Sequence, residues 1–248
     1  MSGKTGTVHI GTSGYQYKHW SGTFYPEDLP KTRWFAFYSG VFDTVEINNT
    51  FYNLPAAKTF DTWRERAPRG FQYVLKFSKF GTHNKKLKDP GQALGRFLDG
   101  AQRLKGCLGP ILVQLPPGWH NNPERLGQFL AKAPGAYRWA VEFRDASWLN
   151  EENYAILRRH NAALVVHDLL PDHPRLLTAD WVYLRFHGPD ALRHAYQGQY
   201  PHQAMRAEAD RLTAHRDAGR DVYVFFNNDE NGYAAANAQQ LRRYIRHR

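Results

Sequence analysis

Charged side chains recur near the ends of short β-rich runs in this sequence. Glu142 and Arg144 are two residues apart, as are Arg185 and His187, and Lys76 ends a run of alternating apolar residues. Because side chains alternate between the two faces of a strand, residues two apart point to the same side. Glutamate and histidine can transfer protons, whereas arginine and lysine can hold a carboxylate or phosphate. The pattern therefore predicts acid–base chemistry on an anionic substrate.

The candidate site residues fall into two groups. Those expected to transfer protons are Glu46, Glu142, His83 and His187, the two glutamates serving as general base and general acid. Those expected to contact the substrate are Asn48, Lys76, Gln114, Arg144, Arg185, Asn227 and Trp20. The strand residues of this set include three basic side chains and two carboxylates, so an anion would balance their charge. The alternative is that both arginines are already paired with Glu46 and Glu142.

Two segments beside these residues have compositions that suit binding. The segment from Lys76 to Lys88 contains five lysines and no acidic residue, so it could attract an anion, or it could be an ordinary solvated loop. The aromatic residues that follow the first β-rich run could stack on a base or a sugar, or pack beneath a long loop. They are Tyr15, Tyr17, Trp20, Phe24 and Tyr25.

No cofactor motif is present. The sequence lacks a Gly-x-Gly-x-x-Gly turn, a Walker loop and a Gly-x-Ser-x-Gly elbow, so the cofactor is unknown. Side chains of metal-ligand type occur without the close spacing of a metal motif, beside basic residues that would repel a cation, so none is assigned to a metal. These side chains are Glu46, Glu142, His83, His167, Asp168 and His187.

The composition restricts the class of protein. A net charge of +10 favours anionic partners such as phosphorylated metabolites or nucleic acid, although it also serves solubility. A single cysteine, Cys107, rules out an internal disulfide framework and predicts a reducing compartment, the cytoplasm. The chain starts without an apolar leader and lacks a run of about 18 apolar residues, so no membrane anchor is expected.

Short β-rich runs alternate with segments of helical periodicity, which is typical of repeated βα units in a parallel sheet. The eight runs are Val8–Gly11, Thr44–Thr50, Phe71–Phe77, Ile111–Leu115, Arg138–Arg144, Ala163–Asp168, Trp181–His187 and Asp221–Asn227. The predicted helices are Lys31–Ser39, Ala57–Ala67, Ala93–Lys105, Pro123–Ala133, Glu151–Asn161, His202–Ala218 and Tyr233–Ile245. Asn122 and Asn150 are expected to cap two of them. Two prolines predict that Leu169–Asp180 contains no full helix.

These elements predict the α/β class, with residues 1–248 forming a single TIM-like (β/α)8 barrel whose sixth crossover is irregular. The chain has 248 residues, and such a barrel needs about 250. All eight runs should be parallel neighbours in one closed barrel. Because TIM-barrel enzymes place their sites at the carboxyl ends of the strands, the candidate residues should share one pocket there.

Several motifs resemble the YecE-like family, the domain of unknown function 72. They span nearly the whole chain and include Ile10–Gly14, Trp20–Gly22, Val45–Asn48, Gln114–Pro117, Ala140–Arg144, Arg185–Gly188 and Phe226–Asp229. The resemblance implies a TIM-barrel-like fold and supplies no settled activity. The recurrent polar positions of the family fall on Glu46, Asn48, Lys76, His83, Glu142, Arg144, Arg185, His187 and Asn227.

Three functions are compatible with these features. The leading hypothesis is an enzyme that acts on an anionic, phosphate- or sugar-containing substrate, with hydrolysis of a phosphoester or glycosidic bond as the simplest reaction. The alternatives are a nucleic-acid-binding protein without catalysis and a metabolite sensor. The expected partner is an anionic small molecule or nucleic acid, and no membrane; the sequence does not predict an oligomeric state.

Overall fold

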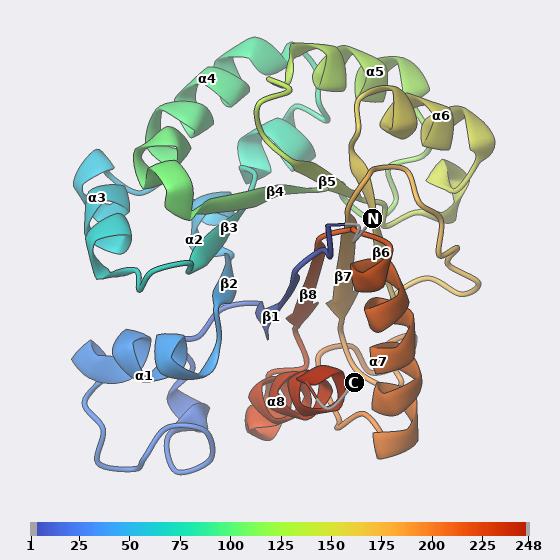
Figure 1. Cartoon of the computed structure of the whole chain (residues 1–248). Helices are drawn as coiled ribbons and strands as arrows, with labels where there is room; N and C mark the ends of the chain where they lie inside the picture. The colour runs from blue at the N-terminus through green and yellow to red at the C-terminus, as the bar shows by residue number, and fades with distance from the viewer. Residues whose placement is uncertain (1–3, 247–248) are drawn as a thin grey trace. The chain divides into compact units, whose positions relative to one another are not determined.

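The computed structural model describes residues 4–246, in which strands and helices largely alternate along the chain (Figure 1). The strands are β1 (Val8–Thr12), β2 (Thr44–Ile47), β3 (Gln72–Lys76), β4 (Leu108–Gln114), β5 (Trp139–Glu142), β6 (Ala163–His167), β7 (Val182–Phe186) and β8 (Val222–Phe226). The α-helices are α1 (Trp34–Val41), α2 (Asn49–Tyr52), α3 (Ala57–Arg66), α4 (Pro90–Ala101), α5 (Pro123–Lys132), α6 (Glu151–Arg159), α7 (His202–Asp217) and α8 (Tyr233–Arg246).

The strand pairing confirms the predicted fold class. The strand order is β1-β8-β7-β6-β5-β4-β3-β2, and the pairs β1–β8, β3–β4, β4–β5, β5–β6 and β7–β8 are parallel. This is the topology of a (β/α)8 barrel. The stretch from Leu169 to Asp180 contains turns and no helix, so the irregular sixth crossover is confirmed. The helix caps are also confirmed, since the Asn122 and Asn150 side chains accept bonds from Arg125 N and Asn153 N.

Several predicted boundaries need correction. β4 begins at Leu108, before the predicted Ile111, and α4 ends at Ala101, before the predicted Lys105. The second β-rich run stops at Ile47, because Asn49–Tyr52 forms the short helix α2. The first predicted helix begins as a 3₁₀ turn over Lys31–Arg33, and α1 starts only at Trp34. Helix α4 begins earlier than predicted, with Pro90 in its first turn, where the missing N–H of proline costs no hydrogen bond.

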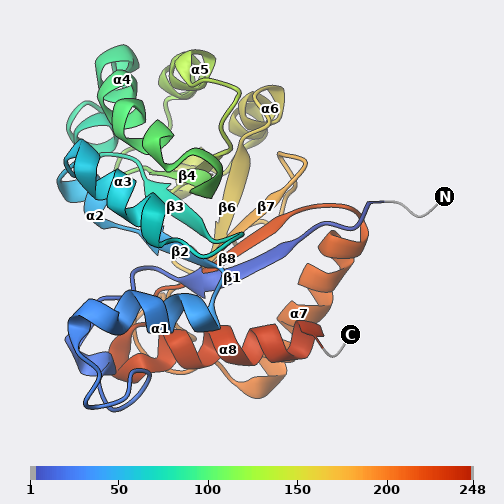
Figure 2. The ribbon, with the colours of Figure 1, turned by 60° about the vertical axis from the view of Figure 1, so that its left-hand side comes forward.

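Residues 4–45, 167–171 and 181–246 form one compact unit, called unit 1 here. It holds β1, β7 and β8, and every residue of β7 and β8 is buried. Helices α7 and α8 pack against each other, and α8 covers β1 and β8 (Figure 2). This packing fixes the end of β7, from which Arg185 and His187 extend.

Residues 46–166 and 172–180 form a second compact unit, unit 2. Helices α3, α4, α5 and α6 follow one another as neighbours around β3, β4 and β5 (Figure 1). The β4–β5 register places Gln114 opposite Glu142, so the last residues of these two strands are adjacent. The assignment of residues 1–248 to a single domain stays a prediction.

A tyrosine hydroxyl bridges β1 and the start of β2, the strands at the two ends of the strand order. The Tyr38 hydroxyl accepts a hydrogen bond from Thr12 N at 2.9 Å and donates to the Thr44 carbonyl at 3.0 Å. A Cβ on Gly11 would lie 2.2 Å from the Thr44 carbonyl oxygen, so only glycine permits this approach. β1 and the start of β2 are therefore linked by the Tyr38 side chain and by a close backbone approach at Gly11, and closure of the barrel stays a prediction.

Candidate functional site

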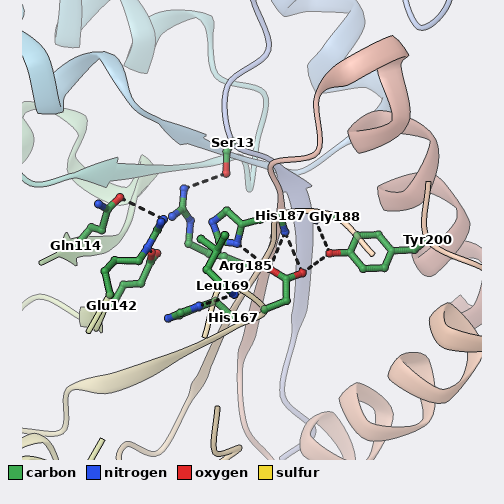
Figure 3. A network of polar contacts seen from close by, with 11 residues as sticks. Ser13, Gln114, Glu142, His167, Leu169, Arg185, His187, Gly188 and Tyr200 are labelled. Carbon is green, nitrogen blue, oxygen red and sulfur yellow. Dashed lines mark hydrogen bonds and ion pairs between the residues drawn. The ribbon is translucent and has the colours of Figure 1, made fainter. Parts of the chain in front are cut away.

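The ends of β4 and β5 bring three predicted site residues together in unit 2. Glu142 is fully buried, and the Arg144 Nε donates a hydrogen bond to its carboxylate. The Arg144 Nη2 lies 3.5 Å from the Gln114 Oε1 (Figure 3). For Arg144, the alternative of pairing with Glu142 is thus correct. The pair still presents a guanidinium whose side chain keeps 12% of its surface exposed.

Lys76 ends β3 beside an aromatic ring. Its side chain is only 8% exposed, and the Nζ lies 4.3 Å from the centre of the Phe51 ring. The Thr50 hydroxyl donates to the Lys76 carbonyl at 2.8 Å, which ties α2 to the end of β3. The His83 ring also packs edge-on against the Phe51 ring, and the two ring centroids are 5.0 Å apart. Lys76, Phe51 and His83 therefore form one cluster.

His83 is held as a neutral imidazole with a defined tautomer. The Thr82 hydroxyl donates to the Ser78 carbonyl at 3.0 Å, so it must accept from the His83 Nδ1 at 2.9 Å. Burial, together with the positive charges of Lys76, Lys79 and Arg144, lowers the pKa of His83 to about 4. The Nδ1 therefore carries the proton and the Nε2 the lone pair.

The lysine-rich segment is anchored at its centre. Leu87 is 1% exposed, whereas Lys85, Lys86 and Lys88 around it are exposed. Lys86, Leu87 and Asp89 have φ values of 46°, 60° and 46°, which are rare for residues other than glycine. The buried leucine holds this strained backbone in place. That the lysine-rich segment attracts anions stays a prediction.

Glu46 and Asn48 lie at the end of β2. Glu46 is fully buried, and Asn48 is half-buried just after the strand. The Asn48 Oδ1 is buried without a hydrogen-bond partner among residues 4–246. Unsatisfied buried acceptors commonly mark a bound water or ligand.

In unit 1, β7 positions Arg185 and His187. Arg185 is 1% exposed, and its Nη2 lies 3.5 Å from the Ser13 Oγ (Figure 3). The His187 side chain is fully buried, and its Nδ1 lies 2.9 Å from the Asp168 Oδ1. The His187 backbone N–H also donates to both carboxylate oxygens at 3.0 Å. Asp168 therefore orients both the backbone and the ring of His187.

Tyr200 completes the Asp168 network. Its hydroxyl donates to the Asp168 carboxylate and accepts from Gly188 N at 2.7 Å (Figure 3). Burial alone would raise the pKa of Asp168, but the hydrogen bonds from His187 and Tyr200 outweigh it and lower the pKa. A carboxylate in this position fixes the Nδ1–H form of His187.

The other two predicted residues of unit 1 have mainly structural surroundings. Trp20 is fully buried, and its indole N–H donates to the Asp229 carbonyl at 2.9 Å. Its ring packs against Tyr17, in agreement with the packing alternative. Asn227 donates its backbone N–H to the Phe186 carbonyl at 2.7 Å. The substrate-binding roles of Trp20 and Asn227 stay predictions.

Several residues that hydrogen-bond to the predicted site residues were not themselves predicted as site residues. Asp168 was noted only as a possible metal ligand, although it ends the sixth predicted strand. Thr82 sits beside His83 without a pattern that predicts its hydrogen bond. Tyr200 lies in a loop with no periodicity, and Asn228, not Asn227, is the buried amide, donating to the Gly198 carbonyl at 2.8 Å. These partners depend on tertiary contacts that strand alternation does not encode.

Each unit thus assembles a separate part of the predicted set. Unit 2 brings Lys76, His83, Gln114, Glu142 and Arg144 close to one another, and unit 1 surrounds Arg185 and His187 with polar partners. That all candidates share one pocket stays a prediction. Across residues 4–246, no three histidine, cysteine or acidic side chains are arranged to hold a metal ion. No helix in the same range is long and apolar enough to cross a membrane.

Known proteins similar to this chain match almost its whole length. The UPF0759 protein YunF of Bacillus subtilis is 24% identical over 268 residues, which cover 94% of this chain and 93% of YunF. The crystal structure of a DUF72 family protein from Thermotoga maritima is 30% identical, with a TM-score of 0.84 over 97% of this chain and 99% of the other. A methyltransferase from Methanosarcina mazei, 11% identical over 99% of this chain and 94% of its own, shares the fold with a TM-score of 0.54.

The family assignment follows from a match along most of the sequence. The model of the family described as protein of unknown function DUF72 matches residues 9–248. This agrees with the resemblance seen in the motifs, which run from Ile10 to Asp229. The chain belongs to the DUF72 family.

Proposed function

We propose that this protein is an enzyme that uses acid–base chemistry on an anionic substrate containing a phosphate or a sugar. The active groups are the polar side chains at the carboxyl ends of the strands, and the simplest reaction is hydrolysis of a phosphoester or a glycosidic bond. One observation carries the proposal: His83 is partly buried beside three basic side chains, and burial and their charges together lower its pKa.

The positive charge around His83 favours an anion. Lys76 is almost fully buried beside the Phe51 ring, and its positive charge acts on His83 together with those of Lys79 and Arg144. A bound phosphate or carboxylate would bring a negative charge to this basic group and accept hydrogen bonds from the Arg144 guanidinium. The same anion would offset the part of the pKa lowering that the neighbouring charges cause, and would so raise the pKa of His83 above about 4, closer to the range in which proton transfer near neutral pH is efficient. Substrate binding would thereby activate the histidine.

The remaining roles follow from the chemistry of each side chain. Glu142 accepts a hydrogen bond from Arg144, and as a carboxylate it suits a general base. In unit 1, Asp168 leaves the Nε2 of His187 as the nitrogen that exchanges a proton with a substrate. The lone cysteine supports a cytoplasmic setting. We assign Glu46 to proton transfer as well, and the substrate contacts to Asn48, Gln114, Arg185, Asn227 and Trp20.

A panel of chromogenic substrates tests this proposal. Purified protein is assayed with p-nitrophenyl phosphate, bis(p-nitrophenyl) phosphate and p-nitrophenyl glycosides. At least one should be turned over, and Glu142→Gln should lower kcat by about 10²- to 10⁴-fold, the usual contribution of a general acid or base. The control is Glu65→Gln, which makes the same change on an exposed side chain.

Two results would overturn the proposal. One is turnover that stays equal in wild type and Glu142→Gln. The other is an absence of turnover across the whole panel together with an absence of calorimetric binding of the two phosphate esters, which are the anions of the panel. If the anions bind but are not turned over by the wild type, the catalytic part of the proposal is wrong.

A further inference from the structure

A cavity of about 230 Å³ opens in unit 2 where α2, the segment after β3 and α4 meet. Its wall contains Phe51, which also contacts Lys76 and His83. Tyr52 and Phe80, which line the cavity, are 66% and 38% exposed. Large aromatic side chains left at the surface around a cavity are typical of a binding site rather than of packing.

Basic side chains border this aromatic wall. Arg96 of α4 lines the cavity, is exposed, and forms no ion pair with any of residues 4–246. The Lys85 Nζ lies 5.7 Å from the centre of the Phe80 ring. An anion at the mouth of the cavity would thus meet a guanidinium that can donate two parallel hydrogen bonds, with an ammonium nearby.

The segment that carries Phe80 is rigidly held. Phe80–Asn84 forms a single π-helical turn, and the Lys85 backbone N–H donates to the Phe80 carbonyl at 2.9 Å. The buried Leu87 anchors the strained backbone that follows. The backbone that carries Phe80 thus has a defined conformation, which reduces the entropy that this part of the wall loses on binding.

The size of the cavity limits the ligand. Pockets for drug-sized ligands measure about 300–1,000 Å³, so this cavity holds one ring system and leaves a charged substituent outside, near Arg96. A ring in the cavity would stack on aromatic side chains. We propose that the cavity binds a planar ring that carries a phosphate, which is the chemistry of a nucleotide.

The proposal concerns binding alone and is independent of whether the protein is an enzyme. The variants that test it leave Glu142 and His83 unchanged. Loss of nucleotide binding at the cavity and loss of turnover in the chromogenic assay are therefore separate results.

Calorimetric titration with adenosine 5′-monophosphate, adenosine and inorganic phosphate tests the proposal. The monophosphate should bind more tightly than either of its parts. Arg96→Gln should lower the affinity for the monophosphate by about tenfold or more and leave the affinity for adenosine unchanged, because only the charged hydrogen bonds are lost. Tyr52→Ala should weaken both the monophosphate and adenosine. Arg66→Gln on α3 is the matched control, since it removes an exposed arginine that does not line the cavity.

Three results would overturn the proposal. One is a monophosphate that fails to saturate the protein at millimolar concentration, and another is an equal loss of affinity for the monophosphate in Arg96→Gln and Arg66→Gln. The third result is inorganic phosphate that binds as tightly as the monophosphate. A single-stranded octanucleotide of adenosine distinguishes the two sources of this chemistry. Affinity similar to that of the monomer identifies a free nucleotide, and much tighter binding with the same sensitivity to Arg96→Gln identifies a nucleotide within a strand.

Discussion

The Tyr200 hydroxyl shows how one buried group can hold a site residue in place. It donates to Asp168 and accepts from the buried Gly188 N–H, and Asp168 in turn orients His187. Tyr200→Phe should therefore lower the free energy of unfolding by about 1.5–3 kcal/mol, because a bond to a charged group is lost and a buried N–H is left unsatisfied. Urea unfolding measures this change.

Tyr196→Phe is the matched control for that experiment. Tyr196 lies in the same loop and is 43% exposed, so loss of its hydroxyl should change stability by less than about 0.5 kcal/mol. Equal changes in the two variants would show that the Tyr200 hydroxyl contributes nothing special to the network.

The hydrogen bond between the Thr82 hydroxyl and the His83 ring leads to a second prediction at the residue scale. Thr82→Val removes the hydroxyl that accepts from the His83 Nδ1, so the ring should shift toward the Nε2–H tautomer. The ¹⁵N chemical shifts of the ring nitrogens report the tautomer directly. Thr82→Ser keeps the hydroxyl and should keep the wild-type shifts; if both variants match the wild type, Thr82 does not determine the tautomer.

At the scale of elements, the approach of β1 to β2 depends on Gly11. Gly11→Ala would place a Cβ 2.2 Å from the Thr44 carbonyl oxygen, so the backbone must move, at a cost of about 1–3 kcal/mol. Gly40 in α1 has open space around it, so Gly40→Ala should instead stabilise the protein by about 0.5–1 kcal/mol through helix propensity. Thermal unfolding of both variants tests this pair of predictions. If both substitutions changed the stability in the same direction, the account of the β1–β2 junction would be contradicted.

The elements themselves could be predicted because their causes are local. Apolar β-rich runs, capping asparagines and prolines identified all eight strands and the lack of a helix between β6 and β7. Boundaries were less accurate where a tertiary contact decides them: Asn49–Tyr52 looks extended by residue type, but the Thr50 hydroxyl bonds to the Lys76 carbonyl and the segment coils into α2. Strand alternation selected Gln114, Glu142 and Arg144, which the structure brings together. It could not select Tyr200, which reaches Asp168 from a loop 32 residues away in sequence.

At the scale of the whole molecule, the charge on His83 links stability to pH. Its pKa is about 4 in the folded protein and about 6.5 in an unfolded chain, so the unfolded chain binds the proton more tightly. The stability contributed by the neutral ring is complete above pH 6.5 and is lost as the pH falls toward 4. Chemical unfolding at several pH values should show this loss in the wild type and a smaller one in His83→Gln.

The measurement that tests the central claim most directly is an NMR titration of His83 with and without an anion. Sulfate serves as the probe because it keeps its charge over this pH range, with chloride at matched ionic strength as the control. The account predicts a pKa of about 4 in chloride and a higher pKa in saturating sulfate, because a bound anion offsets the charges of Lys76 and Arg144 while the effect of burial remains. A pKa near 6.5 in chloride, or the same pKa in both salts, would contradict an anion-binding cluster around His83.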